Sequence, residues 1–157
     1  MAWFHQRQQE VQLEPVTIER LWEIFEGDPS ESVLEDNCIV TGYKGYIATL
    51  KIDGPNMMTV ALTNPVKNFP RDQIKSTLNW ASSRNWLGTV GTCQVSYQPN
   101  EDLLIAESYH TFFIQEGATG KQLAEWLIVG FECETEHLND FCGAFGIEPY
   151  FYRDDNT

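Results

Sequence analysis

Apolar residues near the start of the chain recur with helical spacing. The residues of this stripe, at i, i+3, i+4 and i+7, are Ile18, Leu21, Trp22 and Phe25. Thr17 precedes them as a suitable N-cap, and the Gly-Asp-Pro-Ser run at 27–30 is typical of a helix end. The pattern predicts a first helix between these two signals, preceded by a polar, loosely held arm over residues 1–14.

The hydrophobic period then changes from helical to two. Alternating segments at 37–41, 46–52 and 57–63 predict three short strands, separated by turn residues at 42–45 and 53–56. Their spacing of about ten residues is typical of an antiparallel meander. Asn64-Pro65 is expected to end the third strand.

A second helix is predicted from Pro70, which suits a first helical position, to a stop at Asn85. Its expected buried stripe is Ile74, Leu78 and Ala81. Two longer strands follow at 89–97 and 103–114, with a turn at 98–101 between them.

A third helix is predicted after Gly117-Ala118-Thr119, because the following apolar residues return to helical spacing. A pause near Thr135 is expected, with Thr135 capping a second segment that runs to Phe141. The whole pattern predicts an α+β fold: an antiparallel β-sheet with helices packed on it, in the order α-β-β-β-α-β-β-α. We expect an arm over 1–14, one domain over 15–147, and an acidic, aromatic tail over 148–157.

Charge is distributed unevenly along the 157 residues. The net charge is −13, and residues 101–157 hold twelve acidic side chains but only two basic ones, Lys121 and Arg153. Nucleic acid and anionic membranes both require Lys and Arg to offset phosphate charge, so neither is an expected partner. No secretory signal or span-length apolar run is visible, which predicts a cytoplasmic protein with reduced cysteines.

Two short motifs carry a resemblance to a known family. Residues 78–86 (LNWASSRNW) end the second predicted helix, and residues 117–123 (GATGKQL) begin the third after a strand pair that includes Glu107. Over roughly residues 16–145 the chain resembles the YbjN domain family, described as bacterial sensory-transduction regulators. The resemblance implies a fold similar to type III secretion chaperones, which are dimers that hold extended client segments. It carries over no catalytic residue, and Thr119 and Asn79 are expected to be structural, as a helix cap and a backbone contact near a helix end.

Other constellations favour enzyme chemistry less than a structural role. Cys133, His137 and Cys142, with Glu134 or Asp140, lie close enough in sequence to suggest a metal site, but no Cys-X-X-Cys pair accompanies them. Cys93 or Cys133 with His110 or His137 suggests nucleophilic catalysis, without a supporting motif. We therefore expect no catalytic residue, no cofactor and no metal.

Aromatic residues outside the regular elements are the best candidates for partner binding. They are Trp3, Phe4, Tyr150, Phe151 and Tyr152. Such residues either fold back on the domain or anchor a partner. In contrast, the tryptophans on the predicted helices are expected in the core: Trp22, Trp80, Trp86 and Trp126.

The sequence thus favours a non-catalytic protein-binding module, chaperone-like or regulatory, that forms a homodimer and binds a protein partner. An enzyme that uses carboxylates of the acidic half and a structural subunit of a larger assembly are the alternatives. A deep pocket holding carboxylates of raised pKa would favour the enzyme.

Overall fold

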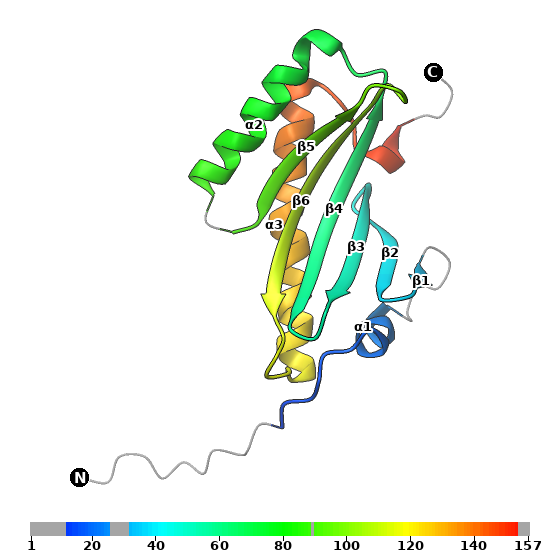
Figure 1. Ribbon diagram of the computed structural model, residues 1–157, viewed down its shortest axis with the longest axis vertical. Helices are drawn as coiled ribbons and strands as arrows, with labels where there is room; N and C mark the ends of the chain where they lie inside the picture. Colours follow the sequence, from blue (N-terminus) through cyan, green and yellow to red (C-terminus); the bar gives the residue numbers. More distant parts are fainter. Residues whose placement is uncertain (1–11, 26–31, 89, 154–157) are drawn as a thin grey trace, which may run out of the picture.

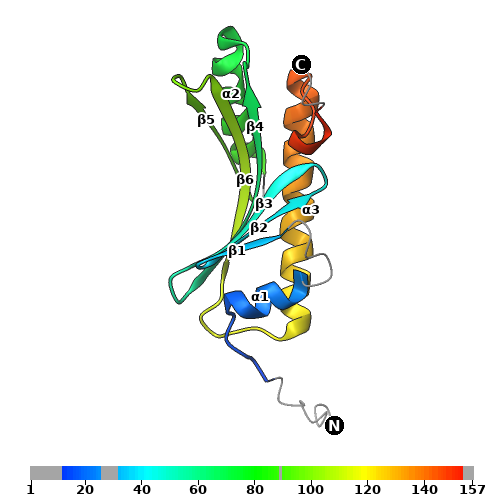
Figure 2. The same ribbon diagram turned by 90° about the vertical axis from the view of Figure 1, so that its right-hand side faces the viewer.

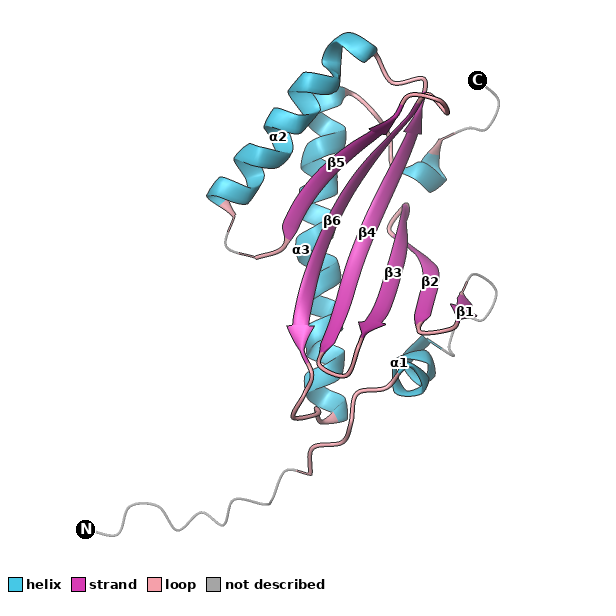
Figure 3. Cartoon of the chain, in the orientation of Figure 1, coloured by secondary structure: helices cyan, strands magenta, loops and turns pink. Residues whose placement is uncertain are grey.

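The computed structural model describes residues 12–25, 32–88 and 90–153 (Figures 1 and 3). Its helices are α1 (Ile18–Phe25), α2 (Ile74–Leu87) and α3 (Gly120–Phe145). Short 3₁₀ turns, η1 (Arg71–Gln73) and η2 (Tyr150–Tyr152), precede α2 and follow α3. Its strands are β1 (Val33–Glu35), β2 (Cys38–Tyr43), β3 (Tyr46–Asp53), β4 (Met57–Lys67), β5 (Thr92–Gln98) and β6 (Leu103–Phe113).

The six strands form one antiparallel sheet in the order β1-β2-β3-β4-β6-β5. Figure 1 looks onto one face of this sheet, with α3 behind it, and Figure 2 shows the layers from the side. No described helix lies on the face toward the viewer in Figure 1, which we call the open face. This arrangement confirms the predicted α+β fold with an antiparallel sheet.

The core lies between the sheet and α3. Alternate residues of each strand face the helix, so Val60, Leu62 and Leu104 are completely buried. The two layers approach closely at Gly130, where a Cβ would come within 3.3 Å of a Val60 methyl group. Thr119 starts α3 with a capping box, as expected, because its hydroxyl accepts from the Gln122 amide while the Gln122 side chain accepts from the Thr119 amide.

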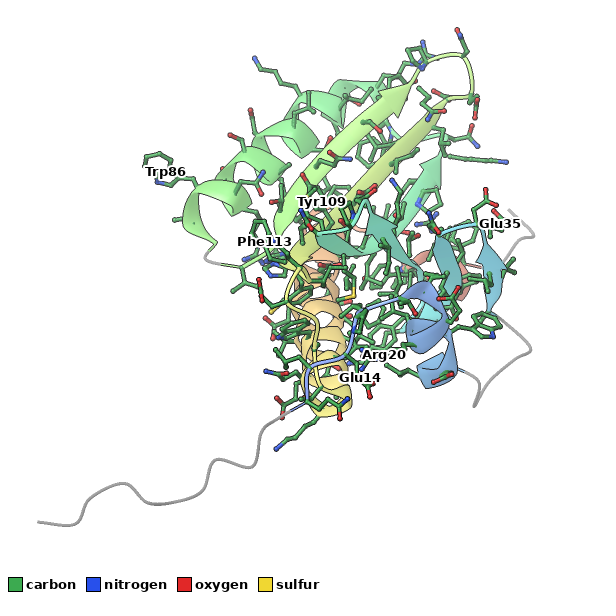
Figure 4. The ribbon with its side chains drawn as sticks, turned by 60° about the horizontal axis from the view of Figure 1, so that its bottom comes forward. Glu14, Arg20, Glu35, Trp86, Tyr109 and Phe113 are labelled. Atoms are coloured by element: carbon green, nitrogen blue, oxygen red, sulfur yellow. The ribbon has the colours of Figure 1, made fainter. Side chains whose placement is uncertain are left out.

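Helix α1 closes the lower end of this core. Leu21 is completely buried, and the Arg20 amide approaches the Thr17 hydroxyl at 3.4 Å in the predicted N-cap arrangement. The Arg20 guanidinium donates to the carbonyls of Glu14, Pro15 and Ala118. Figure 4 shows Arg20 beside Glu14. Glu14 also forms a β-bridge with Ala118, so this cluster joins the chain before α1 to the loop before α3.

Helix α2 covers the β5 edge of the sheet. The side-chain amide of Asn85 donates to the Cys93 carbonyl at 2.8 Å and accepts from the Cys93 N–H at 2.7 Å. These two bonds occupy the backbone groups that an edge strand presents outward. Asp140 of α3 then accepts from Trp80 and Arg84 of α2, which ties the two helices together.

Several element predictions were wrong for identifiable reasons. Strand β1 has only three residues, too few to show a period, and was missed. Strand β4 continues through Pro65 to Lys67, with Pro65 still paired with Ile105 of β6. The Pro65 carbonyl accepts from Arg153 on the other side of β4, beyond the end of β3, so the missing N–H on that same side removes no ladder bond. Helix α3 does not pause at Thr135, whose hydroxyl donates to the Phe131 carbonyl within a continuous helix.

Helix α2 departs furthest from its predicted burial. Leu78 is 50% exposed and Trp86 is 88% exposed, whereas Thr77 and Ala81 are buried. The helix packs along the sheet edge, so its buried stripe is narrow and passes through small side chains. Asn79 is exposed, and the predicted backbone contact is made by Asn85 instead. None of the helices in the described ranges has the length and apolar content needed to cross a bilayer.

Candidate functional site

The open face of the sheet holds a shallow hollow of about 440 Å³, which we call the open trough. Its lining residues come from four adjacent strands and are Thr49, Lys51, Asp53, Thr59, Ala61, Thr63, Gln94, Glu107 and Tyr109. The floor of the trough is formed by β4, whose small side chains leave it low. Thr59, Ala61 and Thr63 point to the open face, in alternation with residues that point into the core. Figure 4 shows Tyr109 in this region.

Charges flank the low centre of the open trough. On the β3 side, Lys51 pairs with Asp53 at 2.5 Å, and this hydrogen bond is the main cause of a lowered pKa for Asp53. On the β6 side, burial raises the pKa of Glu107, while the neighbouring Gln94 side chain lowers it. No cation in the described ranges forms an ion pair with Glu107.

A second and larger hollow, of about 780 Å³, lies between strands β1–β3 and the C-terminal tail. We call it the tail groove. Its lining residues are Val33, Val40, Thr41, Gly42, Tyr43, Lys44, Gly45, Ile47, Tyr150, Phe151 and Tyr152. Val33 and Val40 are direct cross-strand partners, so their side chains share one face of the sheet. The groove is therefore mainly apolar and aromatic.

The tail that forms one wall of this groove is anchored to the domain. Arg153 donates to the Pro65 carbonyl and to the side-chain oxygen of the completely buried Asn64. The Phe151 amide donates to the Gly45 carbonyl at 2.9 Å. Gly45 itself has a φ of +90°, and a Cβ there would lie 2.8 Å from the Tyr152 ring, so this turn requires glycine.

The predicted partner-binding aromatics can be followed only at this end of the chain. Tyr150, Phe151 and Tyr152 are 42%, 55% and 61% exposed and line the tail groove. Their backbone folds onto the domain while their rings stay accessible. Trp3 and Phe4 lie outside the described residues. Partner binding by all five residues stays a prediction.

The cysteine and histidine candidates do not come together as a metal site. No group of three ligating side chains occurs in residues 12–25, 32–88 or 90–153. His137 shares a hydrogen bond of 2.8 Å with the buried Ser108 hydroxyl, and Cys142 accepts from the Asn64 side chain. Burial raises the pKa of both the Cys93 and Cys133 thiols, which disfavours the thiolate that a nucleophile requires.

Glu134 and Glu107 have raised pKa values, but only Glu107 lines a hollow, and no second carboxyl of that hollow lies close enough to act with it. Burial raises the pKa of Glu134 to about 10, yet its side chain has no solvent access. Within the open trough, Glu107 and Asp53 lie two strands and six residues apart by register, which is roughly 20 Å. Paired acid catalysis of glycoside cleavage needs carboxyls within about 10 Å.

The open trough was not predicted from the sequence. Its signal is the run of small residues at alternate positions of β4, opposite the apolar residues that face the core. This alternation shows that β4 has a face turned away from the core, but it does not indicate whether a helix covers that face. Lys51 and Glu107 are brought to the same hollow by strand order, which local pattern does not give.

Comparison with known proteins supports the fold at the level of structure alone. No family model and no curated protein matches the sequence. A structural match is the crystal structure of YbjN from E. coli, described as a candidate transcription regulator. The two share 12% identity with a TM-score of 0.61, over 81% of this chain and 89% of YbjN. This chain therefore has a YbjN-like fold.

Proposed function

We propose that this protein is a non-catalytic binding module that takes an apolar segment of a partner protein into the tail groove. The observation that carries this proposal is the groove itself: aliphatic side chains from three strands face three accessible aromatic rings across a hollow of about 780 Å³. Tyrosine and phenylalanine are enriched at the centres of protein interfaces.

Rigidity of the groove supports this function. The wall formed by η2 is attached to the β2–β3 turn through Gly45 and to β4 through Arg153, so its rings lose little freedom when a partner binds. The opposite wall is β1, which is short and contributes the exposed side chain of Val33. A groove with fixed walls suits a segment that becomes ordered on binding.

Two kinds of similarity support the proposal of a regulatory role. The sequence motifs resemble a family described as sensory-transduction regulators, and the structural neighbour YbjN is described as a candidate transcription regulator. A module of this kind would act by holding or releasing a partner protein. The acidic surface favours a partner whose groove-binding segment is flanked by basic residues.

Affinity capture with matched variants tests this function. The tagged full chain and two variants, Phe151→Ser and Trp86→Ser, are used to capture proteins from a lysate of the source organism, followed by quantitative mass spectrometry. Both variants remove an exposed aromatic side chain, but only Phe151 lines the tail groove. We expect a partner to be recovered with the parent chain and with Trp86→Ser, and at least tenfold less with Phe151→Ser.

Two outcomes contradict the proposal. One is the absence of any protein enriched over a tag-only control. The other is recovery of the same proteins in equal amounts by all three chains, which would exclude the tail groove as the binding surface. Circular dichroism of each variant establishes that the comparison is made between folded proteins.

A further inference from the structure

The charged residues of the open trough have a symmetric arrangement about its centre. In the strand register Lys51 lies beside Thr59 and Glu107 lies beside Thr63, on opposite sides of β4. Ala61 is midway between Thr59 and Thr63 on the same face of β4. Standard strand spacings place the Cα atoms of Lys51 and Glu107 each roughly 8 Å from that of Ala61, in opposite directions.

We propose that the open trough is the face through which two copies of this chain form a homodimer. A two-fold axis that lies in the interface and passes by Ala61 can bring Lys51 of one copy opposite the Glu107 of the second copy. The same rotation brings Glu107 opposite the second Lys51, so one complementary contact is made twice. A surface with unlike charges on either side of a neutral centre is complementary to itself.

The sizes of the side chains in the open trough also suit the packing of two copies face to face. Tyr109 lies beside Ala61 on β6 and is the only aromatic side chain that lines the trough, whereas Ala61, Thr59 and Thr63 are small. Rotation about the proposed axis carries each Tyr109 ring toward the low β4 floor of the other copy. Large side chains opposite small ones are what close packing of two sheets requires.

The charge balance also identifies this face. The strands β3, β4, β5 and β6 direct four charged side chains toward the open face, Lys51, Lys67, Asp53 and Glu107, whose charges cancel. In contrast, exposed acids on α3 include Glu125, Glu132 and Glu136. Two chains of net charge −13 repel each other least when these balanced faces meet.

Glu107 is the residue of the open trough that a cation from a second copy could pair with. Glu107 is half-buried, its side chain interacts with the Gln94 amide, and it has no ion-pair partner in the described ranges. Lys51 has three N–H donors, and Asp53 accepts from this ammonium group. Lys51 of a second copy can therefore reach Glu107 while its own pair with Asp53 is kept.

Complementary charge reversal tests this homodimer. Sedimentation velocity and light scattering give the mass of the full chain, of Lys51→Glu and of Glu107→Lys, each alone and in an equimolar mixture. We expect the parent chain to be a dimer and each single variant to be a monomer, because its two symmetric contacts place like charges together. The mixture should form a heterodimer in which both contacts again join unlike charges.

Controls separate charge at the trough from charge in general. Glu136→Lys makes the same charge change on α3 and should leave the dimer intact. The double variant K51E/E107K should dimerise like the parent chain. Circular dichroism and thermal unfolding identify any variant that fails to fold, and Ala61→Arg, which blocks the centre without reversing a charge, provides a second route to the monomer.

Three outcomes would overturn the proposal. These are a monomeric parent chain, single variants that remain dimers, or a mixture that stays monomeric although each variant alone is folded. None of these results affects the tail groove, because capture through Phe151 depends on a different set of residues. A failed capture with an intact charge-reversal result would likewise leave the dimer standing.

Discussion

The two faces of the β-sheet are made from alternate residues of the same strands, but they are specified by different physical requirements. On the face covered by α3, side chains are completely buried, and the helix approaches so closely at Gly130 that a methyl group there would press on Val60. On the open face, the corresponding positions include threonines, an alanine, the Lys51–Asp53 ion pair and Glu107. Packing against α3 determines the residue types of the covered face, whereas those of the open face depend on solvent and on any binding partner.

This difference is clearest for the carboxyl groups on either side of the sheet. Glu134 is completely buried beneath the sheet, and neither of its oxygens has a hydrogen-bond partner in the described ranges. Glu107 is half-buried above the sheet and lies in a hollow open to a partner. Burial of Glu134 therefore lowers the stability of the chain itself, whereas Glu107 remains accessible to a group on another molecule.

The largest difference is expected between two neighbouring aliphatic residues of β6. Leu104 is completely buried under α3, whereas Ile105 is half-buried on the open face. Leu104→Ala should lower the free energy of unfolding by about 2–5 kcal/mol, and Ile105→Ala by about 1 kcal/mol, because only the first leaves an enclosed cavity. Urea denaturation of both variants measures this; equal losses would mean that the open face is packed as tightly as the core.

A pH-dependent difference of about 3 kcal/mol is expected at Glu134. Burial raises the pKa of this carboxyl to about 10 in the folded chain, against about 4.5 when it is exposed. The folded state then binds a proton that the unfolded state has released, so stability falls as pH rises above about 4.5, by roughly 1.4 kcal/mol per pH unit. The gain from Glu134→Gln over the parent chain should grow at this rate between pH 5 and pH 7.

Urea denaturation across that pH range measures the gain, with Glu136→Gln as the matched control. Glu136 is the exposed acid two residues further along α3 and should show no such growth. A constant difference between Glu134→Gln and the parent chain at all pH values would mean that Glu134 is ionised in the folded state.

A smaller effect is expected where α2 covers the β5 edge. Asn85→Ala removes both side-chain bonds to the Cys93 backbone and should cost about 1–3 kcal/mol, because the edge groups remain beneath α2 without their partner. Asn79→Ala changes the same residue type on the exposed side of α2 and should cost less than about 0.5 kcal/mol. Hydrogen exchange at the Cys93 amide should accelerate only in the first variant.

Much of the covered face could be predicted from the sequence because it follows from local periodicity. The stripe around Leu21, the alternation on either side of the β5–β6 turn and the Thr119 cap all depend on residues within one element. The errors occur where a distant contact decides the outcome. Pro65 remains in a strand because β3 has already ended beside it, and Trp86 is exposed because α2 runs along an edge.

The candidate surfaces were harder to predict for the same reason. The tail aromatics could be singled out because they lie outside the periodic elements, but the groove also needs Val33 of the missed strand β1. The open trough depends on strands β3 and β6 both pairing with β4, so that Lys51 and Glu107 flank the same small residues. No window of neighbouring residues contains that information.

The smallest effect on the folded chain is expected from Glu107→Gln. Burial raises the pKa of Glu107, so removing its charge should raise the free energy of unfolding slightly at neutral pH, by less than about 0.5 kcal/mol. This gain should shrink as the pH falls and the carboxyl takes up a proton. Denaturation at a low protein concentration isolates this term from any association of two copies.

The same variant sharpens the comparison when the protein concentration is raised. If two copies meet through the open trough, the denaturation midpoint of the parent chain rises with concentration, since association stabilises the folded state by mass action. Glu107→Gln lacks the charge that Lys51 of the second copy would contact, so its midpoint should respond much less. A substitution that scarcely changes the stability of one chain but removes its concentration dependence would assign Glu107 to the contact between copies. An equal concentration dependence in both chains would show that copies associate without this carboxylate.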